Sequence, residues 1–244
     1  MIANNELTYV LHTRSYRETS QLVDLFSCRT GRLRAVARGT RGRKKSAVPV
    51  LQAFTPFFAC WQGRGDLKTL TSYEVAQPTG LLRGNALYIG FYINELLCRL
   101  LPEYIPHENL FAQYAGLITT LGDGADPEPG LRVFELSLLE EMGCGLNLYA
   151  DCIDDTPFEA ESNYMFHPPE GFTRVDKAGV YSPQDIFSGA HLRAIADHWF
   201  CDQAVRQSAK RLLRQALASH LGPRPLHSRE LFKQRVGPAP VTPP

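Results

Sequence analysis

Residues 7–38 read LTYVLHTRSYRETSQLVDLFSCRTGRLRAVAR, and this stretch decides the predicted fold. It holds three short runs of mixed apolar and polar residues, separated by polar turns. Alternation with a period of two residues is typical of β-strands that bury one face. In the third run Leu33, Ala35 and Ala37 share one face, and arginines occupy the other. The stretch therefore predicts three consecutive strands, the last with a cationic face.

Two further runs complete the N-terminal pattern, AFTPFFACWQ at residues 53–62 and LKTLTSYEVA at residues 67–76. Glycine turns at residues 28–32 and 62–67 separate neighbouring runs. Because residues 5–75 contain five strand patterns and no long helical pattern, we predict a small closed or partly closed β-barrel.

The pattern changes to helical spacing after residue 79. Apolar residues recur every three or four positions through three predicted helices, before an irregular segment at residues 150–182 with room for a small hairpin. Ser182 is predicted to cap a further helix, and the last long helix ends at Gly222. We therefore predict a multi-domain α+β protein: a barrel domain at residues 1–79, an α-helical domain at residues 80–235 that includes the irregular insertion, and a disordered tail at residues 236–244.

The charge of the chain is segregated along the sequence, although the total is only +1. Residues 1–80 carry 12 Lys/Arg and 5 Asp/Glu, residues 81–190 carry 5 and 17, and residues 191–244 carry 9 and 3. Two basic zones on either side of an acidic one indicate a polyanionic partner.

The segment 29–45 concentrates eight cationic side chains and has no acidic one. Guanidinium groups in a row on a strand can bind phosphate oxygens without reading bases. The alternative is a solvated hairpin that its arginines keep soluble. We expect DNA binding from the cations of the barrel, with a second contact on the last long helix. The candidate residues are Arg14, Tyr16, Arg17, Arg32, Arg34, Arg38, Arg41, Arg43, Lys44, Lys45, Arg64, Lys68, Arg206, Lys210 and Arg214.

Two of these assignments depend on geometry that the sequence leaves open. Tyr16, between Arg14 and Arg17, is the best candidate for stacking on a base, but a small barrel also needs aromatic rings inside. Arg206, Lys210 and Arg214 share one face of a helix, where the alternative is an ordinary solvated face.

Catalytic and metal-binding patterns are weak in this sequence. The six cysteines are scattered and form no C-x-x-C pair, so we expect no structural zinc and no disulfide framework. An alternative function is a phosphodiesterase that holds magnesium through Asp151, Asp154 and Asp155. These acids lack a partnering Glu or His pattern, so we predict a protein that is not an enzyme and needs no cofactor.

The chain resembles the RecO family of bacterial recombination mediators over nearly its full length. The segments LHTRSYRETSQLVDLFS, GRLRAVARGTRGRKK, FTPFFACWQGRGDLKTL, LYIGFYINELLCRLLP, LRVFELSLLEEMGCGLNL and LHSRELFKQ carry the resemblance. It implies a five-stranded OB-fold barrel followed by an α-helical domain. It also implies binding of single- and double-stranded DNA, annealing of complementary strands, and help in loading RecA onto DNA coated by the single-strand binding protein SSB, in recombinational repair.

The resemblance further implies RecR and the acidic, apolar C-terminal tail of SSB as partners. We expect Arg132 to anchor that tail and Leu131 to receive its ring, the alternative being an ion pair of Arg132 with Glu128 or Glu135. Many members of the family carry a four-cysteine zinc module, whereas residues 150–182 keep only Cys152. The resemblance is therefore to a zinc-free subtype.

The sequence contains no apolar run close to the ~20 residues that cross a bilayer. Its first residues are polar and alternating, unlike a secretory signal. We therefore expect a cytoplasmic protein, associated with the nucleoid through DNA.

Overall fold

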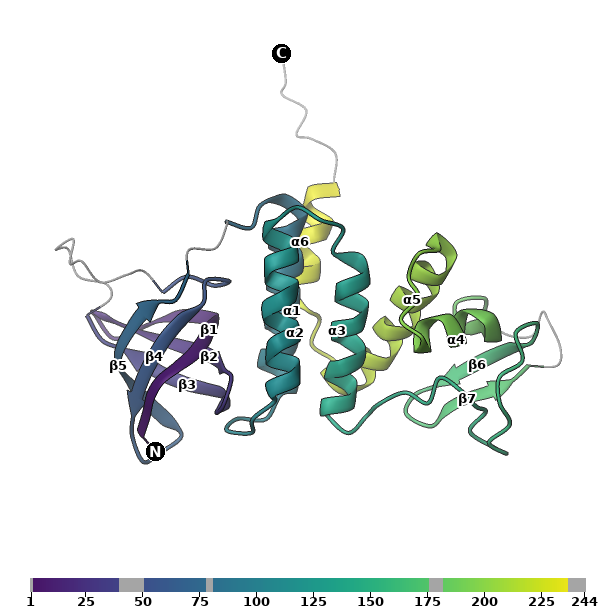
Figure 1. Cartoon of the computed structure of the whole chain (residues 1–244), viewed down its shortest axis with the longest axis horizontal. Helices are drawn as coiled ribbons and strands as arrows, with labels where there is room; N and C mark the ends of the chain where they lie inside the picture. The colour runs from purple at the N-terminus through teal and green to yellow at the C-terminus, as the bar shows by residue number, and fades with distance from the viewer. Residues whose placement is uncertain (1, 40–50, 78–80, 176–181, 237–244) are drawn as a thin grey trace, which may run out of the picture. The chain divides into compact units, whose positions relative to one another are not determined.

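A computed structural model describes residues 2–39, 51–77, 81–175 and 182–236. The chain divides into two compact units (Figure 1). Unit 1 comprises Met1–Ala125 and Arg224–Pro244, and unit 2 comprises Asp126–Pro223. Unit 2 is therefore inserted, in sequence, between two segments of unit 1.

Five strands of unit 1 form a closed barrel in the order β1-β2-β3-β5-β4. Neighbouring strands are antiparallel except β3 and β5, which are parallel. This closed five-stranded barrel confirms the predicted OB-type architecture. The strands are β1 (Ile2–Tyr16), β2 (Ser20–Ser27), β3 (Gly31–Ala37), β4 (Phe57–Gln62) and β5 (Leu67–Val75).

The barrel interior is filled by the apolar face of each strand. Leu33, Ala35 and Ala37 of β3 point into it, as their alternation predicts, and Trp61 of β4 is fully buried there. The opposite face of β3 therefore carries its arginines outward.

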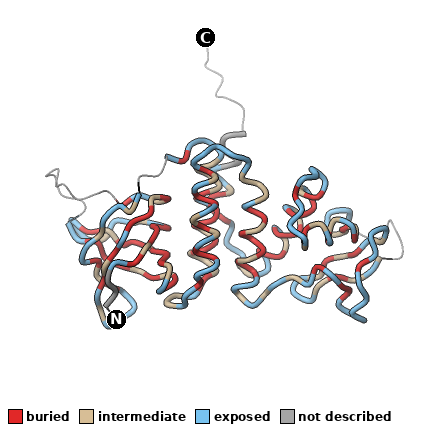
Figure 2. Tube along the Cα trace, viewed as in Figure 1, coloured by how far each residue is buried: buried red, intermediate tan, exposed pale blue. Residues whose placement is uncertain are grey.

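Two helices cover part of the outer face of the barrel. They are α1 (Gly84–Leu100) and α2 (Glu108–Gly122), and each has six buried residues (Figure 2 colours buried residues red). Tyr9 of β1 and Phe26 of β2 are buried outside the barrel core, against Phe111 and Tyr114 of α2 at ring-centroid distances of 5.0–5.9 Å. The barrel and these helices share one core.

A buried polar residue also connects α1 to β1. Asn94, only 2% exposed, donates from Nδ2 to the carbonyl oxygen of Leu11 at 2.9 Å and accepts a hydrogen bond from Tyr114 at 2.7 Å. The acceptor, Leu11, lies at the β1 position where the pairing register with β2 shifts. Asn94 therefore satisfies a strand carbonyl group where the ladder is irregular.

The connection between α1 and α2 lies along β3. The backbone N–H of Tyr104 donates to the carbonyl oxygen of Arg32 at 2.8 Å, beside an isolated parallel bridge between Arg32 and Glu103. Gly31 has a φ of +76°, and a Cβ atom there would lie 1.8 Å from the carbonyl oxygen of Ile105. Only glycine lets these two backbones approach so closely.

Helix α6 (His227–Val236) returns to α1 at the end of the chain. The carboxylate of Glu95 accepts hydrogen bonds from the backbone N–H groups of His227 and Ser228, both at 2.9 Å, and from the Ser228 hydroxyl at 2.7 Å. Burial opposes ionisation of Glu95, but the hydrogen bonds from Ser228 and His227 together lower its pKa below the ordinary value of 4.5. The carboxylate thus caps the first turn of α6.

Unit 2 combines helices with a small sheet. It contains α3 (Glu128–Glu141), β6 (Asn163–His167), β7 (Gly171–Arg174), β8 (Ile186–Ser188), α4 (Gly189–Ala196) and α5 (Gln203–Leu221). The sheet order is β7-β6-β8, and all its pairs are antiparallel. Buried rings of Phe158, Tyr164, Phe166 and Phe172 pack around it at 4.3–5.6 Å. The segment expected to be irregular therefore contains the β6–β7 hairpin.

One predicted helix start is wrong. The helix expected from Ser182 begins at Gly189 and is capped by the Ser188 hydroxyl, which accepts from the backbone N–H of His191. The preceding residues form β8, which pairs with β6. Pairing with a distant strand thus overrides a local signal for a helix N-terminus. Residues 237–244 of the expected tail lie outside the described residues.

Candidate nucleic-acid interface

Exposed arginines gather at one end of the barrel. Tyr16 at the end of β1 pairs with Ser20 at the start of β2, and Gln21 pairs with Ala37 at the end of β3. Arg14 on β1, Arg17 in the β1–β2 turn and Arg38 directly after β3 therefore lie at the same end, and all three are exposed. We call these three residues the cationic end of the barrel. The described part of the chain shows no ion pair for any of them.

Tyr16 lies among these arginines and is half-buried. The guanidinium of Arg17 lies 5.3 Å from the centroid of the Tyr16 ring. A base that stacked on this ring would meet a cation as well as an aromatic face.

The four predicted contacts Arg41, Arg43, Lys44 and Lys45 follow the cationic end in sequence. They lie outside the described residues, so their placement stays a prediction.

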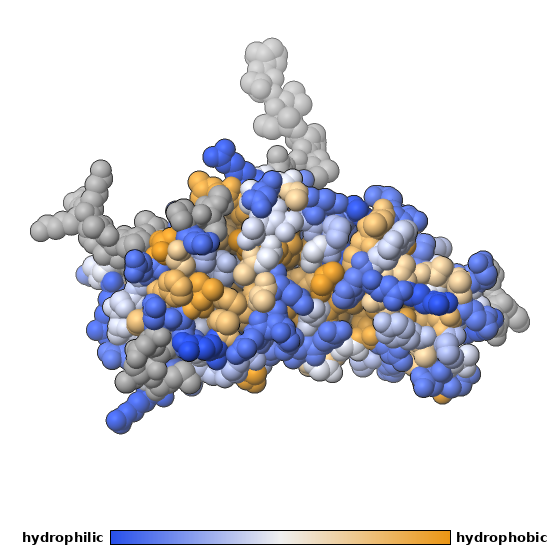
Figure 3. Space-filling model, viewed as in Figure 1, coloured by the Kyte–Doolittle hydropathy of each residue, from blue (hydrophilic) through white to orange (hydrophobic). Residues whose placement is uncertain are grey.

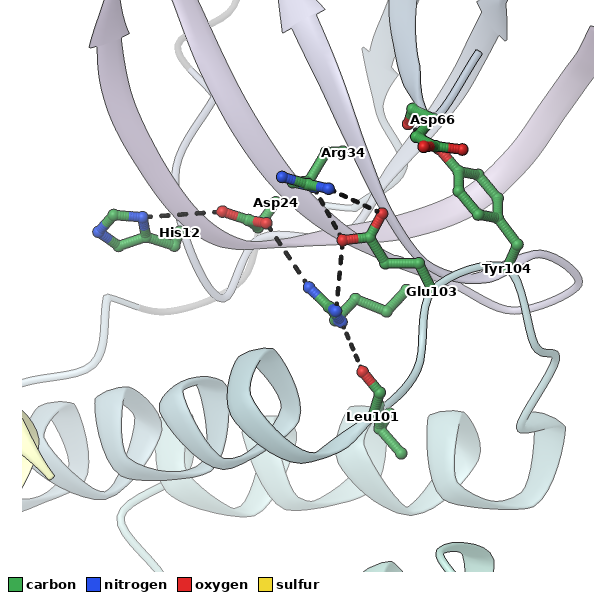
Figure 4. Close-up of polar contacts among 8 residues, drawn as sticks. His12, Asp24, Arg34, Asp66, Leu101, Glu103 and Tyr104 are labelled. Carbon is green, nitrogen blue, oxygen red and sulfur yellow. Dashed lines mark hydrogen bonds and ion pairs between the residues drawn. The ribbon is translucent and has the colours of Figure 1, made fainter. Parts of the chain in front are cut away.

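The arginines on the outer face of β3 have acidic partners (Figure 4). Nη2 of Arg32 lies 3.3 Å from Oε1 of Glu103, and Nε of Arg34 lies 2.8 Å from the same oxygen. Arg32 also donates from Nε to the carbonyl oxygen of Leu101 at 2.8 Å and lies 3.8 Å from Asp24. The side chain of Arg32 is 14% exposed, whereas that of Arg34 is 41% exposed. Only Arg34 is therefore open to a large ligand in this arrangement.

Arg64 and Lys68 belong to the β4–β5 hairpin, at the other end of the barrel. Gln62, directly before this hairpin, pairs with Ile2 at the start of β1. Arg64 is exposed, but Lys68 is 5% exposed and donates to the carbonyl oxygen of Gly65 at 2.6 Å. The Lys68 ammonium also lies 4.6 Å from the ring centroid of Tyr104, so it holds the α1–α2 connection against the barrel.

The surface of the barrel is mixed rather than uniformly charged. Figure 3 shows orange, apolar side chains over the barrel among blue ones. Exposed apolar residues on β4 and β5 include Phe58, Leu67 and Val75. The cationic end is therefore a local feature of the barrel.

Helix α5 carries the predicted second contact, and the structure separates its members. Arg206 pairs with Asp126 at 2.6 Å and also donates to the carbonyl oxygen of Phe200. Lys210 and Arg214 are exposed on this helix. These two cations are therefore the accessible part of the predicted α5 contact.

The residues predicted to receive the SSB tail lie on α3. Leu131 and Arg132 are each 5% exposed, and Arg132 lies 2.5 Å from Glu135, which is itself 2% exposed. This pair is one of the two alternatives that the sequence allows for Arg132. A ligand carboxylate would reach Arg132 only if the buried pair opened.

The acids of the alternative phosphodiesterase site have structural partners. Asp151 is buried, and its two oxygens accept from the backbone N–H groups of Ile153 and Arg174, each at 2.7 Å. Hydrogen bonds from Thr156 lower the pKa of the exposed Asp154. The described residues contain no group of three or more His, Cys, Asp or Glu placed to hold a metal ion. The phosphodiesterase hypothesis therefore has no support here.

Sequence reasoning missed the acids that partner the β3 arginines. Asp24 lies directly across from Arg34 in the β2–β3 register and 3.8 Å from Arg32. Pairing the two predicted strands would therefore have placed this acid beside the β3 arginines. Glu103 follows a predicted helix end, 69 residues after Arg34 in the sequence. No local pattern there indicates a contact with β3.

Comparisons with known proteins cover almost the whole chain. The model of the recombination protein O N-terminal domain matches residues 1–79, and that of the C-terminal domain matches residues 81–230. The DNA repair protein RecO of Pseudomonas aeruginosa is 46% identical over 230 residues, which cover 94% of this chain and 95% of the relative. The DNA repair protein RecO of Haemophilus influenzae is 42% identical over 228 residues, covering 93% and 95%. Among the described residues, no helix is long and apolar enough to span a membrane.

Proposed function

Because this chain belongs to the RecO family, we propose that it is a DNA repair protein that binds single- and double-stranded DNA through the cationic end of its barrel. The observation that carries the proposal is the convergence of Arg14, Arg17 and Arg38 at one exposed end, from which the segment with four further cations continues. Cations without acidic partners gain most from phosphate groups and release counterions on binding.

The proposed role in repair is annealing, which requires no bond to be made or broken by the protein. Phosphate groups of two strands repel each other, and cations at the end of the barrel screen that repulsion while base pairing drives the reaction. The protein would act on DNA in the cytoplasm, at the nucleoid. Neither a nucleotide nor a metal ion enters this mechanism.

We also propose that the protein helps to load RecA onto SSB-coated single strands, together with RecR. The SSB tail would bind at Leu131 and Arg132 of α3, with opening of the Arg132–Glu135 pair. A fluorescence-polarisation titration with a labelled tail peptide tests this contact. Arg132→Ala should weaken binding severalfold, and an unchanged affinity would remove Arg132 from the site.

A salt titration of oligonucleotide binding tests DNA binding itself. Each phosphate contact on a single strand contributes about 0.7 to the slope of log affinity against log salt. The triple variant Arg14→Gln, Arg17→Gln, Arg38→Gln should therefore reduce the steepness of the slope by about 2. The matched control is Arg29→Gln, at an exposed arginine in the β2–β3 turn at the other end of the barrel, and it should change the slope little. Equal losses per charge in both variants would contradict a localised interface.

A further inference from the structure

A carboxylate lies between two guanidinium groups on the outer face of β3. Oε1 of Glu103 lies within 3.3 Å of Nη2 of Arg32 and within 2.8 Å of Nε of Arg34 (Figure 4). Two arginines that converge on one anion form the arrangement that also binds a phosphate group. Here the anion is supplied by the protein itself, from the connection between α1 and α2.

The two arginines differ in how firmly they are held. Arg32 has a partner for each of its three nitrogens, namely Leu101, Asp24 and Glu103, and its side chain is 14% exposed. Arg34 has only Glu103 as a partner among the described residues, and 41% of its side chain is exposed. A competing anion would therefore bind Arg34, whereas Arg32 would keep its present partners.

The fit between Glu103 and Arg34 is imperfect. Oε2 of Glu103 lies 3.4 Å from Nη2 of Arg34, beyond the usual length of a charge-assisted hydrogen bond. The Nε proton of Arg34 has no well-aligned acceptor among the described residues, although Oε1 of Glu103 lies 2.8 Å from Nε. A phosphate group can place two oxygens along the two N–H directions of an exposed arginine. It would thus satisfy Arg34 better than the carboxylate does.

The position of Arg34 connects this pair to the cationic end. Arg34 lies on the outer face of β3, and Arg38 follows directly after the strand, four residues on. A rise of about 3.3 Å per residue places them about 13 Å apart along the strand. A DNA strand held at the cationic end and running along β3 would reach Arg34 within a few nucleotides.

We propose that Arg34 is a phosphate site that Glu103 occupies in the free protein, and that a DNA backbone displaces Glu103 from it. The inference rests on the proposed DNA binding and adds a competitor built into the same face of the barrel. Glu103 then lowers the affinity for DNA and limits how far along β3 a bound strand extends.

The substitution Glu103→Gln tests the proposal, because it removes the competing charge and nearly keeps the shape of the side chain. Affinity for a labelled oligothymidylate, measured by fluorescence anisotropy, should rise severalfold. The slope of log affinity against log salt should steepen by up to about 0.7, because the phosphate contact at Arg34, incomplete while Glu103 competes, becomes complete.

The control is Glu74→Gln on β5, an exposed acid whose replacement changes the net charge equally. It should leave the salt slope unchanged. A double-mutant cycle adds Arg34→Gln, which should lower the wild-type affinity modestly, because Glu103 competes for Arg34 there, and should abolish the whole gain in the Glu103→Gln background. This non-additivity separates competition for Arg34 from a general change in electrostatic potential.

The outcomes distinguish this inference from the proposed function. If the wild type ignores oligonucleotides at low salt, the proposed function itself fails. If the wild type binds with a steep salt slope but Glu103→Gln and Glu74→Gln behave alike, only the role of Glu103 is overturned.

Should Glu103→Gln melt at a much lower temperature, Glu103→Asp provides the second variant, because its shorter side chain withdraws the carboxylate from Arg34 and keeps the charge. Tighter binding by Glu103→Asp would support the competition, and wild-type affinity would refute it.

Discussion

At the scale of single residues, the outer face of β3 depends on a glycine and on two arginines with different partners. Gly31 admits the backbone of the α1–α2 connection, which in turn brings Glu103 to Arg32 and Arg34. The alternation in RLRAVAR predicted correctly which side chains point outward. It could not predict that acids meet two of them, because Glu103 is distant in sequence and only the folded connection delivers it.

Gly31→Ala should destabilise the protein by about 2–4 kcal/mol, since the new Cβ would overlap the carbonyl oxygen of Ile105 and the residue has a left-handed φ. The matched control is Gly124→Ala, where φ is +74° and a Cβ would have no neighbour within 4 Å. The control should cost about 1–2 kcal/mol, from backbone strain alone. Urea denaturation of both variants measures the difference, and equal losses would show that the close approach at Gly31 does not matter.

At the scale of elements, the barrel strands, the long helices and a hairpin within residues 150–182 could be predicted, whereas β8, the third strand of the small sheet in unit 2, could not. Five alternating runs in a short segment leave few architectures, and the barrel follows from them. Residues 182–185, directly before β8, read SPQD and resemble a helix N-terminus. The strand conformation of β8 comes from pairing with β6, which no local pattern records. The predicted interface shows the same limit, because the sequence reveals the arginines of β3 but not Asp24 and Glu103, the acids that pair with them.

The contact between α6 and α1 should depend on pH through Glu95. Because the folded pKa of Glu95 lies below its ordinary value of 4.5, ionised Glu95 stabilises the folded state. This stabilisation is complete above about pH 5 and is lost as the pH falls through the lowered pKa.

The measurement is the difference in free energy of unfolding between wild type and Glu95→Gln. It should be largest near pH 6 and shrink towards pH 3, because protonated Glu95 no longer offers a charged acceptor to His227 and Ser228. A difference that stays constant over this range would mean that the charge of Glu95 does not stabilise α6.

At the scale of the whole molecule, the barrel shares its packing with helices that follow it in sequence. Tyr9 and Phe26 are 5% and 0% exposed because α2 covers them. The family models divide the chain near residue 80, whereas compactness groups α1, α2 and α6 with the barrel. The family models thus divide the chain by sequence similarity, whereas packing divides it by which elements are compact together.

A fragment of residues 1–79 should therefore be less stable than one of residues 1–125. The shorter fragment exposes two aromatic rings on the outside of the barrel, so it should bind a hydrophobic dye and self-associate. Thermal unfolding, dye fluorescence and sedimentation velocity compare the two fragments. A monomeric 1–79 fragment with the melting temperature of the 1–125 fragment would show that the barrel is stable without α1 and α2.

The position of α6 has a consequence for synthesis of the protein. Unit 1 is translated in two parts, residues 1–125 before unit 2 and residues 224–244 after it. Glu95 and Arg99 gain their partners at residues 224–228 only after all of unit 2 has been translated. Every residue of unit 2 therefore leaves the ribosome before α6 does, so unit 2 can complete its fold before unit 1.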